Sequence, residues 1–334
     1  MKNTLFAVQA FDHDAVLARG REVVQIEREA LTLLERSLDD RFVVACQAIY
    51  DTTRQLVVTG MGKSGHIGRK IAATFAATGT PAVFIHPAEA SHGDLGMLVK
   101  GDVLLVFSNS GNTTELRSIL AYARNMGVCI IGVASRAASL LMEQADIPIC
   151  LPLTREACAA NVAPTTSTAL QLALGDALAM AVMDMRGISK SRLRSLHPGG
   201  NIGLQLTPIT EIMHGPERLP LVAQSAGMPD VITIMTSGRF GLSGVVDQAG
   251  SLVGVITDGD LRRHFDSLPT ATAGQVMTRS PKTLPGDMLA ADALMFLNDN
   301  KITAAFVIDR FDTAHPMRPV GIVHIHDLLR LGLN

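Results

Sequence analysis

The chain has 334 residues, of which 47% are hydrophobic and 18% charged, and its formal net charge is −2. This composition excludes global disorder, and the length allows two or three domains. The small net charge excludes a general attraction to nucleic acid or anionic lipid, so a bound anion must be held by local groups. No membrane span is predicted, because the apolar run from Gly175 to Met185 is short and contains Asp176 and Asp184.

The four cysteines are scattered along the chain and form no Cys-x-x-Cys pair. Cys129 and Cys150 lie in apolar runs, as small core residues do. The first residues reach Asp12, His13 and Asp14 without the pattern of a signal peptide. These features are typical of a reduced, cytoplasmic protein.

Residues 14–49 carry apolar side chains at helical spacing, which predicts one or two amphipathic helices. From Leu56 the pattern changes to short apolar strands that alternate with helices. The strands are predicted at 56–59, 82–85, 103–108, 129–134 and 147–151, and the helices at 67–78, 114–126, 138–144 and 167–185. This alternation predicts a parallel sheet covered on both faces, of the flavodoxin-like doubly wound kind, with a ligand at the carboxyl ends of its strands.

Two loops rich in glycine and hydroxyl side chains follow the first and third predicted strands. They are Thr59-Gly60-Met61-Gly62-Lys63-Ser64-Gly65 and Ser108-Asn109-Ser110-Gly111-Asn112-Thr113. A strand that ends in such a loop before a helix offers backbone N–H groups and hydroxyls to a phosphate. Two such loops in one unit predict a site for a phosphorylated small molecule, although an ordinary helix cap stays open as the alternative for the second loop.

The first loop matches two nucleotide-binding motifs only in part. The Walker A motif requires a leading glycine, where this chain has Val57. The glycines at 60, 62 and 65 fit the dinucleotide fingerprint, but Lys63 lies inside the turn and the next strand runs into His86 rather than an acidic residue. The sequence therefore disfavours nucleotide hydrolysis and dinucleotide binding.

A turn-rich hinge at 196–201 ends this unit, and a weak internal repeat follows. Both copies, 212–261 and 276–328, begin with Ile-Met or Val-Met, contain a strand that ends in Asp, and finish near an Asp-Leu pair. Repeats of this kind are supersecondary units that pack against each other. The predicted domains are 1–207, 208–272 and 273–334.

Five segments carry a resemblance to a known family. They are Gly-Met-Gly-Lys-Ser-Gly-His-Ile-Gly at 60–68, Ala-Glu-Ala-Ser-His-Gly-Asp-Leu-Gly at 88–96, Ser-Asn-Ser-Gly at 108–111, Ala-Pro-Thr-Thr-Ser at 163–167 and Leu-His-Pro-Gly-Gly at 196–200. Together they resemble a sugar isomerase (SIS) domain of the arabinose-5-phosphate isomerase type, and the repeat resembles a tandem CBS pair. The implied fold is α/β: a five-stranded parallel flavodoxin-like SIS sheet with flanking helices, then an α+β CBS pair.

The resemblance also implies an activity and an assembly. The family interconverts D-ribulose 5-phosphate and D-arabinose 5-phosphate, which feeds the Kdo sugar of lipopolysaccharide, and its members are usually homotetramers in which a neighbouring chain can supply site residues. The reaction requires no cofactor, and a family histidine that corresponds to His86 can hold an inhibitory zinc ion. The implied partner is a small sugar phosphate, not nucleic acid or a membrane.

The resemblance also matches the functional residues of the family to individual positions of this chain. The catalytic lysine, glutamates and histidine correspond to Lys63, Glu115, Glu156 and His197. The substrate-binding positions correspond to Ser64, Gly79, Thr80, His86, His92, Ser108, Ser110, Thr113, Thr165 and Thr166. Two residues depart from the pattern: Asn112, where some relatives carry glutamate, and His324, where a CBS ribose-binding motif has Thr or Ser.

These residue types suit aldose–ketose isomerisation. The reaction moves a weakly acidic proton through an enediol, so it needs a tuned base, a group that holds the oxyanion, and an acid/base pair that opens the furanose ring. His197 and Glu156 are the leading acid/base candidates, Lys63 would steady the oxyanion or the phosphate, and Glu115 would act as a base or orient another group. A purely structural role stays open for each, such as a helix-dipole partner for Glu115.

The CBS pair and the whole chain each leave alternatives open. Thr257 and Asp260 of the first copy suit a ribose contact and hence a nucleotide effector, whereas the alternative is a structural tetramerisation module. A sugar-phosphate sensor or transcriptional regulator is the second function class, but the arginines at 19–28 are interspersed with glutamates, unlike a basic recognition helix. An isomerase of another sugar phosphate is the third.

Overall fold

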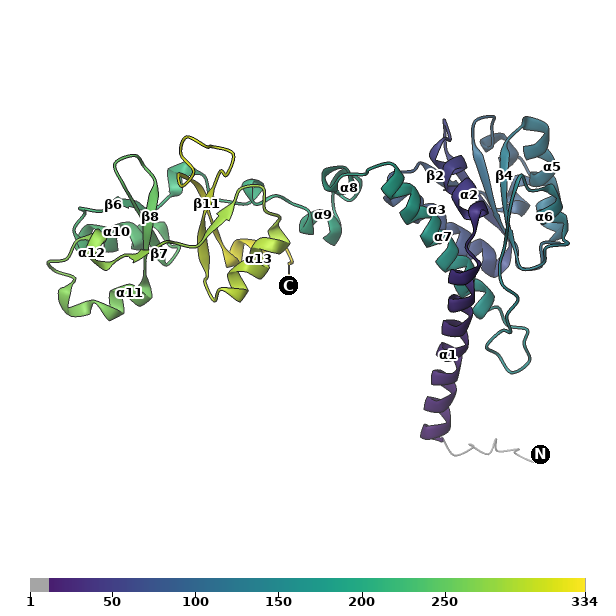
Figure 1. The fold of residues 1–334 in the computed structure, drawn as a ribbon, viewed down its shortest axis with the longest axis horizontal. Coiled ribbons are helices and arrows are strands. Elements are labelled where there is room, and N and C mark those ends of the chain that lie inside the picture. The colour runs from purple at the N-terminus through teal and green to yellow at the C-terminus, as the bar shows by residue number, and fades with distance from the viewer. Residues whose placement is uncertain (1–11, 334) are drawn as a thin grey trace, which may run out of the picture. The chain divides into compact units, whose positions relative to one another are not determined.

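The computed structural model describes residues 12–333, apart from the side chains of residues 201 and 202. The described chain forms two compact units that divide between Ser189 and Lys190, whereas the sequence predicts a boundary at 207. The expectation about a signal peptide concerns residues that are partly outside the described range. Figure 1 shows the helices and strands of both units.

The first unit is built on a five-stranded sheet with the order β2-β1-β3-β4-β5. The strands are β1 Leu56–Gly60, β2 Ala82–Phe84, β3 Val103–Phe107, β4 Cys129–Ala134 and β5 Ile147–Cys150. Every pairing between them is parallel. This order and polarity confirm the flavodoxin-like doubly wound sheet that the alternating pattern predicts.

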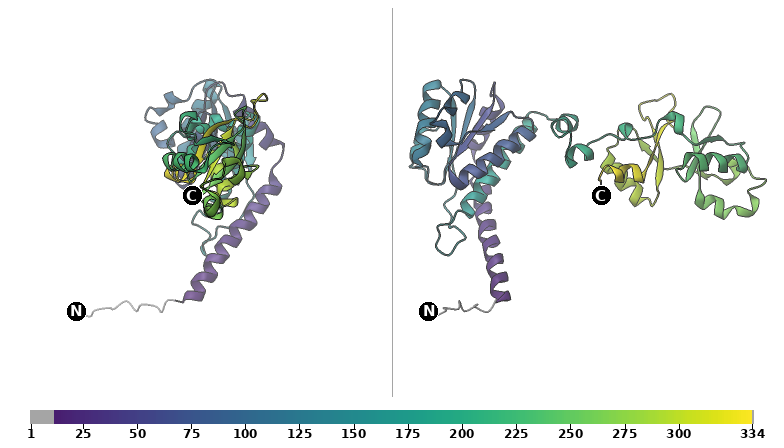
Figure 2. Two further views of the ribbon diagram at one scale, coloured as in Figure 1. Left: turned by 90° about the vertical axis from the view of Figure 1, so that its left-hand side faces the viewer. Right: turned by 180° about the vertical axis from the view of Figure 1, so that it is seen from behind.

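Helices cover both faces of this sheet, as Figure 2 shows from two further sides. One face carries α1 His13–Ser37, α2 Asp40–Tyr50, α3 Gly62–Ala77 and α7 Thr166–Met185, and the other carries α4 Pro87–Ala90, α5 Arg117–Met126 and α6 Leu140–Gln144. Two 3₁₀ turns, η1 Asp94–Met97 and η2 Thr114–Leu116, complete the second layer. Because strand side chains alternate, Leu56 and Val58 enter the first core cluster and Val57 enters the second.

The helix α3 begins five residues earlier than the sequence predicts, in a stretch rich in glycine. These glycines let the helix approach the sheet closely. A Cβ atom at Gly65 would lie 2.5 Å from the Gly60 carbonyl oxygen, and one at Gly68 would lie 3.0 Å from the Phe84 ring. Close packing therefore overrides the low helix propensity of glycine.

Among the described helices, α7 is long and apolar enough to cross a membrane by length and composition. The expectation that no segment spans a membrane rested on the second half of this helix, from Gly175. In the structure α7 packs against α1, α2 and α3, and it buries Leu170, Leu174 and Leu178 in the first core cluster. It is therefore the central core helix of the first unit.

The second unit begins with α8 Lys190–Leu196 and α9 Asn201–Gln205, which flank the predicted hinge. One sheet, β6-β7-β8-β9, comprises Leu221–Ala223, Leu242–Val246, Leu252–Thr257 and Thr278–Arg279, with helices α10 Met228–Gly238, α11 Asp258–Arg263 and α12 Ala273–Val276. The other, β10-β11-β12, comprises Thr283–Pro285, Ala304–Ile308 and Pro319–His324, with α13 Ala290–Asp299 and α14 Ile325–Arg330. The loops of this unit also contain three short 3₁₀ turns: η3 Ile209–Glu211, η4 Pro216–Arg218 and η5 Phe265–Ser267.

The two copies of the internal sequence repeat have the same arrangement of paired strands. In each copy a parallel pair is followed by an antiparallel pair with a bulge near its end: β6·β7 and β7·β8 in the first, β10·β11 and β11·β12 in the second. The two copies share an apolar cluster that contains Phe240, Leu242 and Leu252 from the first and Ala304, Phe306 and Ile322 from the second. The copies therefore stabilise one another.

We expect Phe306→Ala to lower the free energy of unfolding of the full chain by about 3–5 kcal/mol. Phe306 is fully buried in the shared cluster, so truncation leaves a cavity between the copies. Chemical denaturation followed by circular dichroism measures the change. Phe311→Ala is the matched control, because the Phe311 side chain is exposed; equal losses in both variants would contradict the packing argument.

Candidate functional site

A cavity of about 270 Å³ lies at the carboxyl ends of β1 and β3. Its lining residues are Met61, Lys63, Ser64, Phe107, Ser108, Asn109, Ser110, Thr113, Pro164 and Ser167. In the order β2-β1-β3, the chain leaves β1 toward one side and β3 toward the other, so a crevice opens between the two strand ends. The fold therefore places both hydroxyl-bearing loops at its topological switch point.

The first loop presents an uncapped helix N-terminus to this cavity. Met61 is the N-cap of α3 and makes no side-chain cap bond, and the first turn contains no acidic residue. Gly62 has φ +58°, a left-handed conformation that glycine adopts without strain. The unpaired N–H groups and positive dipole end of α3 therefore favour an anion beside Lys63 and Ser64.

The second loop holds its hydroxyls in a small hydrogen-bond network. The Ser108 and Thr113 hydroxyl oxygens are 2.8 Å apart, and the Gly111 N–H donates to Ser108 Oγ at 3.1 Å. The Asn112 N–H donates to Ser110 Oγ at 3.3 Å. Gly111 has φ +68°, which suits the tight turn. The network fixes the oxygen atoms that face the cavity.

Glu156 is tied to the N-terminus of α7. Its Oε2 accepts bonds from the Thr165 N–H at 2.8 Å, the Thr165 hydroxyl at 3.1 Å and the Ser167 N–H at 3.2 Å. Burial raises the pKa of the Glu156 carboxyl, but the hydrogen bonds from residues 165 and 167 outweigh it and hold the pKa below its usual value. The carboxylate is therefore ionised at neutral pH and acts as a helix cap.

Glu156→Gln should therefore change stability in a pH-dependent way. A carboxyl with a lowered folded-state pKa contributes stability above its unfolded pKa and loses that stability as the pH falls through the folded pKa. The variant should be less stable at about pH 7, and its deficit should shrink as the pH falls below the ordinary value of 4.5. Urea unfolding across this range tests it. A deficit that stays constant with pH would contradict the assignment.

The structure brings together several of the predicted site residues around the cavity: Lys63, Ser64, Ser108, Ser110 and Thr113 line it. Glu156, Thr165 and Thr166 lie at the start of α7, whose Ser167 also lines it. Of the four catalytic candidates, Glu115 is in η2 and exposed. His197 follows α8 in the second unit, so it is not one of the residues that the first unit gathers.

Within the second unit, His197 has a defined ring orientation. Its Nδ1 lies 2.8 Å from the Leu193 carbonyl oxygen. A carbonyl only accepts hydrogen bonds, so Nδ1 carries a proton and Nε2 is the ring nitrogen that this bond leaves free to exchange a proton.

Two predicted substrate residues lie away from the cavity. Gly79 and Thr80 follow the C-terminus of α3, and the next residue, Pro81, bonds to Leu56 at the start of β1. They are thus at the amino ends of the strands, about 24 Å along α3 from Lys63. There the Thr80 hydroxyl accepts a hydrogen bond from Arg186, which joins the residues after α3 to the residue after α7.

His86 and His92 lie beyond β2, outside the cavity lining. His86 is the N-cap of α4, and its Nδ1 accepts from the Ala88 N–H at 3.3 Å, which leaves Nε2 for other contacts. His92 is exposed. Within residues 12–333, no cluster of three or more His, Cys, Asp or Glu side chains has the arrangement of a metal site.

Three residues that line the cavity are not among the predicted site residues: Asn109, Pro164 and Ser167. Each is adjacent to a residue that was assigned. The Ser167 side chain is buried, and its hydroxyl is among the groups that lower the pKa of Glu156, so it connects the cavity wall to that carboxylate.

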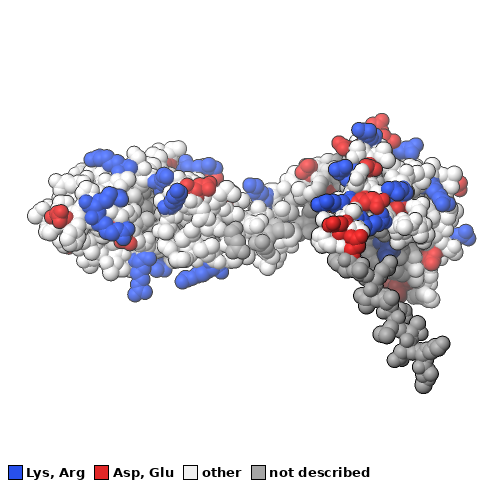
Figure 3. Space-filling view, turned by 90° about the horizontal axis from the view of Figure 1, so that it is seen from below, with Lys and Arg blue, Asp and Glu red and all other residues white. Residues whose placement is uncertain are grey.

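The second unit holds a larger cavity, of 530 Å³, between its two copies. Thr257 and Asp260 line it together with four cationic side chains, Arg262, Arg263, Lys282 and Lys301. Asp260 accepts from the Thr257 hydroxyl at 2.7 Å and from Arg263 at 2.5 Å. On the face shown in Figure 3, Lys and Arg outnumber Asp and Glu over this unit.

At the corresponding position in the second copy, histidines surround Asp327. Asp327 accepts from His214 Nε2 at 3.0 Å and from the His324 N–H at 3.1 Å, while the His326 N–H donates to His324 Nδ1. Burial and the neighbouring His326 lower the pKa of His324. The ring therefore takes the place that the Thr257 hydroxyl has in the first copy.

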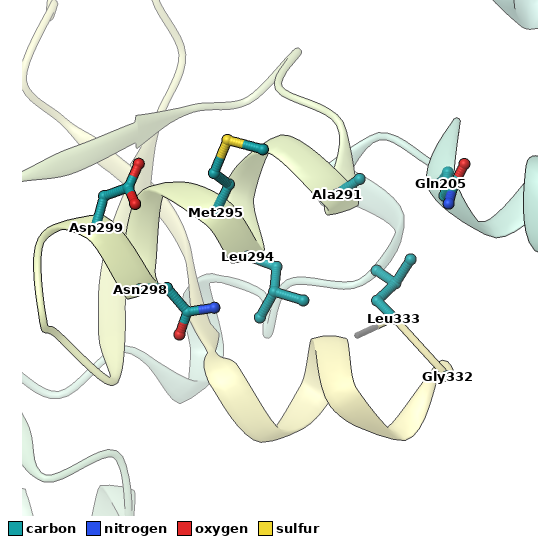
Figure 4. Close-up of a pocket in the computed structure, with 8 residues that line it drawn as sticks. All are labelled: Gln205, Ala291, Leu294, Met295, Asn298, Asp299, Gly332 and Leu333. Carbon is teal, nitrogen blue, oxygen red and sulfur yellow. The ribbon is translucent and has the colours of Figure 1, made fainter. Parts of the chain in front are cut away.

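A separate cavity of 410 Å³ lies between α9, α13 and the residues after α14 (Figure 4). Its side chains include Leu294, Met295 and Leu333, with Asp299 as its acidic group. No two groups among those that line it form an acid/base pair or an anion cradle. This cavity therefore offers no reaction chemistry comparable to that of the first unit.

Comparisons with known proteins agree with this geometry. A model of the SIS domain matches residues 49–181, and a model of the CBS domain matches 209–267 and 273–334. The chain is 42% identical over 318 residues to arabinose 5-phosphate isomerase KdsD of Pseudomonas aeruginosa, which covers 94% of this chain and 96% of that protein. For KdsD of Escherichia coli K12 the identity is 38%, with coverage of 94% and 95%.

A solved structure resembles the first unit. The Escherichia coli CFT073 protein c3406, in complex with arabinose 5-phosphate, is 33% identical and superposes with a TM-score of 0.53. The match covers 56% of this chain and all of that chain. The likeness thus concerns the sheet that carries the two hydroxyl-bearing loops.

Proposed function

This chain belongs to the family of arabinose 5-phosphate isomerases, with an SIS domain and two CBS domains, and we propose that it interconverts D-ribulose 5-phosphate and D-arabinose 5-phosphate at the cavity between β1 and β3. The observation that carries this proposal is the meeting of two hydroxyl-bearing loops and an uncapped helix N-terminus at one cavity. This arrangement supports the capture of a phosphate monoester, which orients the sugar carbons for reaction.

In the proposed mechanism, Ser64, Ser108, Ser110 and Thr113 hold the phosphate and Lys63 adds a positive charge. The cation stabilises the phosphate or the oxyanion of the enediolate. Glu156 or His197 removes the proton from the carbon beside the carbonyl and returns it to the neighbouring carbon, while the other opens the ring. Glu115 stays a candidate base or orienting residue.

The assay that tests the function offers three substrates to the purified full chain: ribulose 5-phosphate, fructose 6-phosphate and glucose 6-phosphate. We expect turnover of the pentulose phosphate alone. Turnover of a hexose phosphate alone would favour an isomerase of another sugar phosphate. Binding without turnover of all three would favour a sensor. In the cell we place the product in Kdo and lipopolysaccharide biosynthesis in the cytoplasm.

We also propose that the chain works as a homotetramer, in which a neighbouring chain supplies His197 to the cavity. Exposed apolar side chains on α1 and α2 support this assembly. They are Val16, Leu17, Val24, Leu33, Val43 and Val44. Several exposed apolar side chains on neighbouring helices are typical of a protein–protein interface. Light scattering should give four times the chain mass.

The proposed reaction requires no cofactor, and zinc enters only as an inhibitor at His86. His86 offers one free ring nitrogen, because its Nδ1 accepts the Ala88 N–H. The neighbouring described side chains complete no three-ligand set around it, so a zinc ion there would need ligands from another chain or from the substrate. No step of the mechanism passes through the metal.

For the second unit we propose that a nucleotide binds at Thr257 and Asp260, with the four cations of the cavity facing its phosphates. Calorimetry with AMP and ATP should give one site per chain. Thr257→Ala should weaken binding about tenfold, which corresponds to one lost hydrogen bond. His324 is the residue of the second copy that corresponds to Thr257, and His324→Ala should leave nucleotide binding unchanged. If neither nucleotide releases heat, the pair is a structural tetramerisation module.

A further inference from the structure

A long segment without helix or strand, residues 151–165, joins β5 to α7 and carries Glu156. Loops of this length in a compact domain are uncommon and usually functional or disordered. One side of this segment is fastened to α7 by the bonds from residues 165 and 167 to the Glu156 carboxylate. The position of Glu156 therefore also depends on the contacts of its neighbours in the chain, residues 155 and 157.

Two residues of α1 hold the residues on either side of Glu156. A guanidinium nitrogen of Arg19 donates to the carbonyl oxygen of Ala157. Glu22, one turn further along α1, has its Oε1 3.9 Å from a guanidinium nitrogen of Arg155. Arg19 also donates to Glu22 Oε2 at 2.6 Å, so the two α1 residues form one unit.

The carbonyl bond is the stronger part of this arrangement. The Arg19 and Glu22 side chains are 43% and 49% exposed, and ion pairs in such positions contribute little by themselves. A charged guanidinium that donates to a backbone carbonyl makes a directional bond of the stronger, charge-assisted kind. It holds the carbonyl of Ala157, the residue that directly follows Glu156.

We propose that Arg19, oriented by Glu22, is a positioning residue for the isomerase reaction, because it fixes the backbone that carries Glu156. The inference rests on the proposed function, in which Glu156 is an acid/base of the reaction. Arg19 does not line the cavity or contact its two hydroxyl-bearing loops, so it acts through the segment that carries Glu156. A displacement of the reacting group by about 1 Å can cost on the order of a hundredfold in rate.

The test compares Arg19→Ala with Arg28→Ala in the full-length chain. Arg28 is exposed on the same helix, and its side chain forms no hydrogen bond or ion pair with the rest of the described chain, which makes it a matched control. We expect Arg19→Ala to lower kcat about tenfold with little change in KM, because the phosphate loops are untouched. The control should behave as the parent protein does, with the same oligomeric state.

A pH profile separates positioning from a merely structural role. When the segment loosens, the bonds that lower the Glu156 pKa are made less often, so that pKa rises toward its usual value. The acid limb of kcat/KM should therefore move to higher pH in Arg19→Ala. Arg19→Lys keeps one donor and should restore part of the rate.

A double-mutant cycle ties the effect to Glu156. In a Glu156→Gln background, Arg19→Ala should cause no further loss, since the group that it positions has already lost its chemistry. The same tenfold loss in both backgrounds would overturn the inference, as would equal kinetics for the Arg19 and Arg28 variants. If Arg19→Ala fails to fold, Glu22→Gln provides the same comparison. An inactive parent protein would instead refute the proposed function.

Discussion

Lys63→Met should lower kcat/KM for ribulose 5-phosphate by about 10²–10³. Lys63 lies in the first turn of α3 and lines the cavity, and in the proposed mechanism its ammonium group is the cation next to the bound phosphate and the developing oxyanion. Methionine keeps the length and the apolar stem of the side chain and removes only the charge. Steady-state kinetics at saturating and limiting substrate measure the loss.

The division of that loss between kcat and KM identifies the role of the cation. A loss in KM alone indicates phosphate binding, and a loss in kcat indicates a contact made only in the transition state. Lys70→Met is the matched control, because Lys70 is exposed on the same helix and pairs with Asp176. If both variants keep the parent kinetics, Lys63 is a solvated lysine without a role in the reaction.

Glu156→Gln should lower kcat by about 10²–10⁴, the usual contribution of one well-placed acid or base. The change keeps the shape of the side chain but removes its ability to take a proton. Incorporation of solvent deuterium at C2 of the sugar phosphate should fall with turnover if Glu156 moves that proton. Retained exchange with lost turnover would instead assign Glu156 to ring opening.

The control for this variant is Glu143→Gln, since Glu143 is an exposed glutamate in α6, away from the cavity. His197→Ala should show a loss of similar size. Near-normal turnover in both Glu156→Gln and His197→Ala would remove the acid/base assignment altogether.

The structure adds a condition to the role of Glu156. A carboxylate that accepts three hydrogen bonds and has a lowered pKa is a weaker base than a free one. To remove a weakly acidic proton, it must lose at least one of these donors when the substrate binds. Arg19 then matters most, because its bond to the Ala157 carbonyl keeps the backbone in place while the side chain changes partners.

The sequence predicted the sheet of the first unit well, because its signals are local. Each strand is a short run of mostly apolar residues, and all five match the observed strands within two residues. The two loops were also recognisable, since a strand, a glycine-rich turn and a helix follow one another in the chain. Because the strands are parallel, their carboxyl ends and the loops that follow them lie at the same edge of the sheet.

Features that depend on tertiary contacts were not predictable in the same way. The start of α3 was missed because Gly65 and Gly68 weaken a local helix signal while they permit close packing on β1 and β2. Gly79 and Thr80 were assigned to the substrate by resemblance, yet they follow the end of α3 farthest from Lys63. The contact between Arg19 and Ala157 joins segments that no sequence pattern relates.

The most direct test of the isomerase proposal follows ¹³C-labelled ribulose 5-phosphate by NMR after the purified full chain is added in deuterated buffer. We predict that arabinose 5-phosphate appears with deuterium at C2, that the reverse reaction reaches the same equilibrium, and that Ser108→Ala with Ser110→Ala suppresses both. An unchanged spectrum with correctly folded protein, for this substrate and for arabinose 5-phosphate, would contradict the proposal.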